Sequence, residues 1–175
     1  MKKFWSVIFL SIPLMSFSQE KAAVGMTIEE VKKIYPDLKT DTNENGTAFS
    51  RPEKLNGLDV EWGYRFKEKK LDWIYFDKYI NELNEANFKT CLSATRQLVK
   101  DYTKLYGMPD TTITGDTTFI DPYIKKHWGY NVLEARWKNY NGMKIKVEFT
   151  FMGGKGQYAF LVKSNYFEKN YPYYD

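Results

Sequence analysis

Alternation of apolar and polar positions predicts most of the strands of this chain. The clearest case is residues 58–66, where apolar or aromatic side chains occupy every second position and charged or small residues lie between them. A period of two is typical of an antiparallel β-strand with one buried face. The same reasoning predicts strands over 48–50, 71–79, 133–140, 143–151 and 158–162. Between two of them, Asn141-Gly142 is a strong signal for a two-residue hairpin turn.

Two segments have the spacing of helices. Thr27 and Glu30 can form a capping box at the start of a short helix, which Pro36 stops. Residues 84–106 carry apolar side chains at spacings of three and four, which predicts a long helix with one apolar stripe. Because Cys91 lies on this stripe, we expect a buried and unreactive thiol.

The two halves of the chain resemble each other at an offset of 85 positions. Residues 56–66 align without gaps on residues 141–151, and every core-face position is apolar or aromatic in both. Each half runs helix, strand, strand, strand, which gives two candidate repeats, 25–82 and 84–167. This order predicts the α+β class, with antiparallel sheet and two helices on one face. This similarity between the halves reflects either a tandem α-β-β-β duplication or a chance resemblance between alternating strands.

The first residues have the layout of an export signal. Lys2 and Lys3 precede an apolar run over 4–15, and small residues follow at Ser16 and Ser18. About a dozen apolar residues are too few to cross a membrane core that needs roughly 20. We therefore expect a cleaved signal peptide and no membrane span.

Cleavage after residue 18 would leave residues 19–175 as a single α+β globular unit. No Cys follows the apolar run, so we expect no lipid anchor. The Ser-Phe-Ser-Gln ending resembles signals common in Bacteroidota. We expect an exported, periplasmic protein, and secretion beyond the outer membrane remains open.

Composition and charge exclude several classes of function. One Cys excludes an intramolecular disulfide and a Cys-based metal site, and one His excludes a multi-His metal site. The formal net charge of +4 includes the two lysines of the signal, so the rest of the chain has no electrostatic footprint for nucleic acid. No nucleophile motif or phosphate-binding loop is present. We expect no enzymatic activity, no cofactor and no metal.

The aromatic content of the chain is high, at 18%, and one predicted strand carries more apolar side chains than a single buried face requires. Over residues 71–79, Ile74 and Phe76 alternate with Trp73 and Tyr75, so the strand is apolar on both faces. Either this is a central strand buried on both sides, or one face contacts a partner. Ile74 and Phe76 are therefore candidate binding residues.

A second set of candidates lies in residues 108–132, which have no periodic pattern and are expected to be irregular. Tyr123, Trp128 and Tyr130 belong to residue types enriched at binding hot spots. They could contact a protein or stack on the rings of a glycan. The alternative for Trp128 is that it folds back to cover the core.

The start of the first helix carries a resemblance to known exported domains. Gly25-Met26-Thr27, followed by Glu30-Val31 and then antiparallel strands, resembles the β-lactamase-inhibitor-protein-like group and the small lipoprotein of the outer-membrane β-barrel assembly machinery. Other exported bacterial proteins share a similar GMTxEEV start. The resemblance implies an α+β layer, sometimes in tandem, that binds proteins and catalyses nothing. There is no lipidated Cys, and Tyr35-Pro36 replaces the expected Gly-x-Pro, which only Gly107-Met108-Pro109 matches.

These observations favour an exported, non-enzymatic module that binds a protein partner in the bacterial cell envelope. The alternative is an exported protein that binds a small ligand or a glycan through its loop aromatics.

Overall fold

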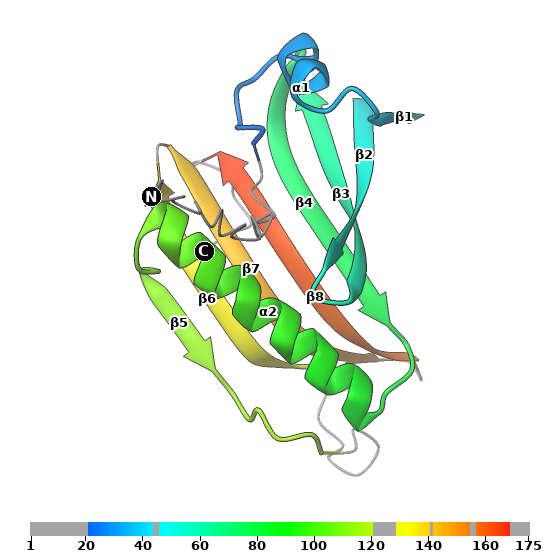
Figure 1. The fold of residues 1–175 in the computed structure, drawn as a ribbon, viewed down its shortest axis with the longest axis vertical. Helices are drawn as coiled ribbons and strands as arrows, with labels where there is room; N and C mark the ends of the chain where they lie inside the picture. Colours follow the sequence, from blue (N-terminus) through cyan, green and yellow to red (C-terminus); the bar gives the residue numbers. More distant parts are fainter. Residues whose placement is uncertain (1–20, 44–45, 121–128, 141, 155–156, 169–175) are drawn as a thin grey trace, which may run out of the picture.

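The computed structural model describes residues 21–43, 46–120, 129–140, 142–154 and 157–168. Within these ranges the chain forms two α-helices and one eight-stranded antiparallel sheet (Figure 1). The helices are α1 (Ile28–Ile34) and α2 (Glu85–Tyr106). The strands are β1 (Lys39–Asn43), β2 (Gly46–Leu55), β3 (Leu58–Lys67), β4 (Lys70–Ile80), β5 (Thr111–Thr114), β6 (Tyr130–Tyr140), β7 (Met143–Gly154) and β8 (Gln157–Glu168). The predicted α+β class and antiparallel sheet are confirmed.

The strands follow the order β1-β2-β3-β4-β8-β7-β6-β5 across the sheet. Each half of the chain supplies four consecutive strands that pair with their neighbours in sequence. The two halves meet where β4 pairs with β8, with Ile74 opposite Tyr166 and Phe76 opposite Ser164. β4 and β8 are therefore central strands, and β1 and β5 are the edges.

Tight hairpins with glycine at positive φ join two pairs of neighbouring strands, β2 to β3 and β6 to β7. A two-residue turn links β2 to β3, and its Gly57 has a φ of 85°. β6 pairs with β7 up to Tyr140 opposite Met143, and Gly142 between them has a φ of 79°. Positive φ at such positions matches the turn to the twist of the strands. The pairing confirms the hairpin predicted here, although Asn141 itself lies outside the described residues.

α1 begins with the capping box that the sequence predicts. The Thr27 backbone N–H donates to Glu30 Oε2 over 2.7 Å, and the Glu30 N–H donates to Thr27 Oγ1 over 3.3 Å. The bond from the Thr27 backbone lowers the pKa of the Glu30 carboxyl below its ordinary value. The helix ends before Tyr35, because the residue that precedes Pro36 disfavours helical geometry.

α2 is the long helix that the pattern over 84–106 predicts. The Asn84 side chain accepts the Asn87 N–H over 2.8 Å, and Gly107 ends the helix with a φ of 81°. The helix packs across β6, β7 and β8 (Figure 1). Cys91 faces the sheet and is fully buried, and burial raises the pKa of its thiol to about 12. The expectation that the Cys91 thiol is buried is confirmed.

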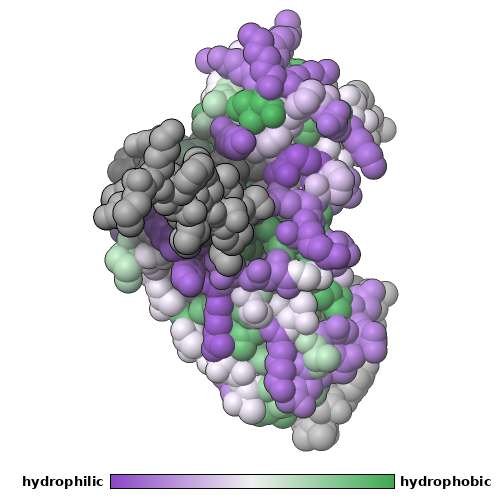
Figure 2. Space-filling model, in the orientation of Figure 1, coloured by the Kyte–Doolittle hydropathy of each residue, from purple (hydrophilic) through white to green (hydrophobic). Residues whose placement is uncertain are grey.

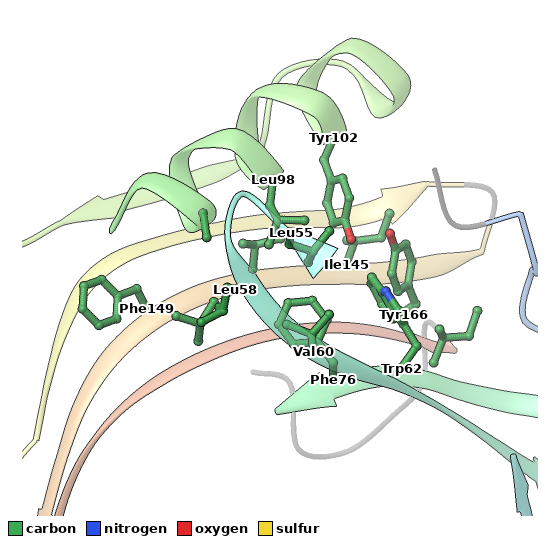
Figure 3. Close-up of a cluster of buried hydrophobic side chains, with 14 of the residues drawn as sticks. Leu55, Leu58, Val60, Trp62, Phe76, Leu98, Tyr102, Ile145, Phe149 and Tyr166 are labelled. Atoms are coloured by element: carbon green, nitrogen blue, oxygen red, sulfur yellow. The ribbon is translucent and has the colours of Figure 1, made fainter. Parts of the chain in front are cut away.

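The main core fills the space between α2 and the sheet, on the side that we call the helix face (Figure 3). The Trp62 ring of β3 lies 4.8 Å from the Phe76 ring of β4, and the Tyr102 ring of α2 lies 5.6 Å from the Tyr166 ring of β8. The buried Tyr102 and Ser164 hydroxyls are 3.0 Å apart, so each gives the other a hydrogen-bond partner. Much of the aromatic content of the chain is used in this core.

Several elements differ from the sequence prediction. The sequence predicts no strand at β1 or β5, and β5 lies within 108–132, which is therefore not irregular throughout. The sequence also ends the last strand at residue 162, whereas β8 continues to residue 168. The extension contains Ser164 and Asn165, both buried, which interrupt the apolar pattern. Their hydrogen-bond partners come from α2 and β4, which the local pattern of β8 cannot reveal.

Candidate functional site

Side chains that alternate with the core residues form the other side of the sheet, which we call the open face. On β4, Ile74 and Phe76 point to the helix face and are 0% exposed. Trp73, Tyr75 and Tyr79 alternate with them and therefore point away from α2. The strand is thus apolar on both faces, as its sequence indicates, and only one of these faces belongs to the main core.

Exposed apolar side chains concentrate on the open face. In the described part of the chain, four large hydrophobic residues are clearly exposed, and three of them project from this face. They are Tyr79 (53% exposed) on β4, Met152 (41%) on β7 and Ile113 (41%) on β5, whereas Met108 follows α2. These three side chains stand on three different strands of one face, which makes this face the candidate interaction surface.

Trp73, Tyr75, Phe167 and Arg65 form an aromatic cluster on the open face. The Trp73 ring centroid lies 4.4 Å from that of Tyr75 and 5.6 Å from that of Phe167. The Arg65 guanidinium lies 4.7 Å from the Trp73 ring centroid and donates two hydrogen bonds, of 3.1 and 2.6 Å, to the Asp72 carboxylate. The cation–π contact and the bidentate pair fix these side chains relative to one another.

Two further residues hold the rings against the sheet. Gly63 lies opposite Tyr75, and a Cβ atom at Gly63 would come within 2.6 Å of the Tyr75 ring. The ring therefore occupies the space that any larger residue would need. On the other side of β4, the Trp73 indole Nε1 donates to Asn165 Oδ1 over 3.1 Å. The rings of the aromatic cluster are thus held in place by contacts within the protein itself.

An ion-pair network covers the open face of β6, β7 and β8. Glu134 and Glu148 lie directly opposite each other and are only 1% and 4% exposed. Arg136 and Lys146 are ion-paired with Glu134, Lys146 at 3.3 Å. Lys146 and Lys163 are ion-paired with Glu148, Lys163 at 2.7 Å. Two adjacent carboxylates would repel each other, so the three cations are what makes this arrangement stable.

The pKa values of two acids at this network, Glu148 and Asp77, are shifted in opposite directions. Burial raises the pKa of the Glu148 carboxyl, but hydrogen bonds from Lys146 and Lys163 outweigh burial and bring the pKa below its ordinary value. Asp77 lies opposite Lys163 on β4. Desolvation raises the pKa of Asp77, Lys163 opposes that rise and Glu148 adds to it, so the pKa lies above its ordinary value.

The residues selected from the sequence are placed as follows. Ile74 and Phe76 lie in the main core and not at the surface. Tyr130 is half-buried at the start of β6 and packs against the core. Tyr123 and Trp128 lie outside the described residues. The structure therefore does not bring the three described candidates together at an exposed site.

Sequence reasoning missed Arg65, Tyr79 and Phe167. The signal that could have found this surface is the two-sided apolar pattern of β4, because Ile74 and Phe76 fill the core and leave Trp73 and Tyr75 for the other face. Which distant residues join them depends on the pairing of β4 with β3 and β8.

The open face carries aromatic rings and paired charges, which are residue types common at protein interfaces. Among the described residues, no group of three or more His, Cys, Asp or Glu side chains is placed to hold a metal ion. None of the helices in the described residues has both the length and the apolar character needed to cross a membrane.

Comparisons of the chain with protein-family models, curated proteins and solved structures give no significant match.

Proposed function

We propose that this protein is an exported, non-enzymatic α+β module that binds a protein partner in the bacterial cell envelope through the open face of its sheet. One observation carries the proposal: three of the four clearly exposed large hydrophobic side chains of the described part, Tyr79, Met152 and Ile113, project from this face. The open side of an antiparallel sheet usually carries polar side chains. Exposed apolar side chains in these positions are better explained by a partner that covers them than by contact with water.

The aromatic cluster and the ion-pair network supply two kinds of contact. Trp, Tyr and Arg are the residue types that contribute most to binding energy at protein interfaces, and Trp73, Tyr75 and Arg65 are held in fixed positions. Lys146 and Lys163 are each partly exposed at the outer side of the network. Partly exposed charges such as these favour one orientation of a partner over others.

Export is part of the proposal and is supported by the sequence. The charged start, the apolar run and the small residues before position 19 fit a signal peptide over residues 1–18. We propose a periplasmic location without a lipid anchor. Sequencing of the mature N-terminus should begin at Gln19, and an N-terminus at Met1 on the protein isolated from cells would contradict export by this signal.

We further propose that α1 covers the helix face together with α2, and that the chain arose by tandem duplication. The Tyr35 ring, at the end of α1, lies 5.7 Å from the Tyr64 ring, and Tyr64 shares a strand face with Trp62 of the main core. Counted inwards from its own edge of the sheet, each half places its strands in chain order, β1 to β4 from one edge and β5 to β8 from the other. The 85-residue offset aligns β3 with β7, and each is the third strand from its edge. Related sequences should preserve this offset if the duplication is real.

Binding is tested with an envelope extract of the source bacterium. The wild-type protein, a Tyr79→Glu variant and a Met108→Glu control are immobilised in turn, and the retained proteins are identified by mass spectrometry. Both variants place a charge at an exposed apolar position, but only Tyr79 lies on the open face. We expect one protein to be retained by the wild type and the control, and to be retained about tenfold less by Tyr79→Glu.

Two results would overturn the proposal. One is the absence of any specifically retained protein, and the other is equal retention by all three forms. Retention of a polysaccharide in place of a protein would favour the glycan-binding alternative.

A further inference from the structure

The solvent side of α2 carries a row of polar and basic side chains. Lys89, Ser93, Arg96 and Lys100 follow one another at helical spacings of four, three and four residues. Together with Leu92 and Gln97 they line a shallow groove of about 310 Å³. Hydrophilic side chains lie along this helix in the view of Figure 2. We call this surface the basic row.

The acids of α2 leave the centre of the basic row without a counter-charge. Glu85 is ion-paired with Lys89 at 2.7 Å. Asp101 accepts two hydrogen bonds from Gln97, of 2.8 and 2.9 Å, and lies 3.8 Å from Lys104.

Arg96 and Lys100 are both exposed, and in the described part of the chain no ion pair is formed by either. They are four residues apart on one helix, and like charges at this spacing repel each other. A carboxylate placed between them would relieve the repulsion and bind both.

We propose that the basic row docks an acidic helix of a second protein. Side chains three and four residues apart form the ridges by which helices pack, so a partner helix with carboxylates at the same spacings would meet the cations in register. The Arg96 guanidinium can bind a carboxylate through two parallel hydrogen bonds, and Lys100 adds a second charge. This surface lies on the opposite side of the sheet from the open face, so it does not depend on the proposed function.

An acidic protein segment fits the basic row better than an anionic membrane. A helix that binds at a membrane surface buries its apolar side among the lipids. The apolar side of α2 is already packed on the sheet, with Phe88, Leu98 and Tyr102 buried there. Only a few charges would then face the lipids, and few charges give weak attraction to a membrane.

The full-length protein is titrated into a fluorescein-labelled synthetic helical peptide with Glu at positions i, i+4, i+7 and i+11, and binding is followed by fluorescence anisotropy at low ionic strength. A peptide with Gln in place of Glu is the probe control. The test variant is Arg96→Glu/Lys100→Glu. The protein control is Lys33→Glu/Lys67→Glu, which makes the same charge change at exposed residues elsewhere.

We expect the Glu peptide to bind about tenfold more weakly to Arg96→Glu/Lys100→Glu than to the wild type, and the Gln peptide not to bind. The control pair and the Tyr79→Glu variant should bind the Glu peptide as the wild type does. Equal loss in both charge-reversed pairs, or equal binding of both peptides, would overturn the proposal. Stronger binding to phosphatidylglycerol vesicles than to the Glu peptide, lost in Arg96→Glu/Lys100→Glu, would also overturn it, in favour of a membrane.

Discussion

The helix face and the open face of the sheet are built from the same strands, yet they differ in what surrounds their aromatic side chains. On the helix face, Trp62 and Phe76 are buried against each other beneath α2. On the open face, Trp73 and Tyr75 remain half-buried and are held by Arg65, by neighbouring rings and by the sheet itself. The first arrangement stabilises the fold through burial. The second keeps rings in a fixed place at the surface, which is what a binding site requires.

The two faces also differ in how their buried polar side chains find partners. On the helix face, the buried Tyr102 and Ser164 hydroxyls satisfy each other as a single neutral pair. On the open face, Glu134 and Glu148 are part of a network of five charged side chains that spans three strands. A network of this size is sensitive to the loss of any member, because each cation serves a carboxylate that is nearly inaccessible to water.

The largest expected effect separates the two faces on one strand. Phe76→Ala removes a fully buried ring from the main core and should lower the free energy of unfolding by about 3–5 kcal/mol. Tyr79→Ala, three residues along β4 and on the open face, should change it by about 0.5 kcal/mol or less. Chemical denaturation measures both values. Similar costs for the two variants would show that the open face belongs to the core.

The next effect concerns the charge network, and its size depends on pH. The pKa of Glu148 lies below its ordinary 4.5, so its ionised form stabilises the fold above that value, and this stabilisation is lost as pH falls through the folded-state pKa. We expect Glu148→Gln to lower the free energy of unfolding by about 2–3 kcal/mol at neutral pH. The deficit should shrink in acid.

Asp77 provides the matched comparison because its pKa is shifted upward from 3.8. Its ionisation therefore opposes folding, and the cost is absent below the ordinary pKa and appears as pH rises through the raised pKa. Asp77→Asn should be more stable than the wild type at neutral pH and should lose this advantage in acid. Unfolding curves at several pH values that changed in the same direction for both variants would contradict this account of the network.

A smaller effect tests how the aromatic cluster is held. Gly63→Ala places a methyl group where the Tyr75 ring now lies, and should cost about 1–2 kcal/mol and change the near-ultraviolet circular dichroism of the cluster. In a Tyr75→Ala background the same substitution should cost less, because the ring is no longer there to be displaced. Equal costs in the two backgrounds would show that the glycine is needed for another reason.

The sequence predicts those parts of the fold that depend on local pattern. The alternation over 58–66, the capping box of Thr27 and Glu30, and the apolar stripe of α2 each lie within one element, and each is confirmed. β1 and β5 were not predicted because they are short edge strands, KTDTN and TTIT, without apolar alternation. Their strand geometry comes from pairing with β2 and β6 and not from their own residues.

The candidate site depends on contacts between distant parts of the chain, which limits prediction. Trp73 meets Phe167 only because β4 pairs with β8, across 94 positions of sequence. In the sequence, Glu134 and Glu148 occupy the polar positions of alternating strands, which are usually exposed. They are buried because they lie opposite each other and are surrounded by three cations from neighbouring strands. Sequence reasoning correctly found that strand 71–79 has an additional apolar face, but it selected Ile74 and Phe76, which belong to the core.

The central claim is that the open face is the binding surface, and site-specific photo-crosslinking tests it most directly. A photoreactive phenylalanine analogue replaces Tyr79 in one form of the full-length protein and Met108 in another, and both are irradiated in cells of the source organism. The account predicts a discrete adduct with one envelope protein from position 79 and none from position 108. No adduct from position 79, or the same adducts from both positions, would contradict it.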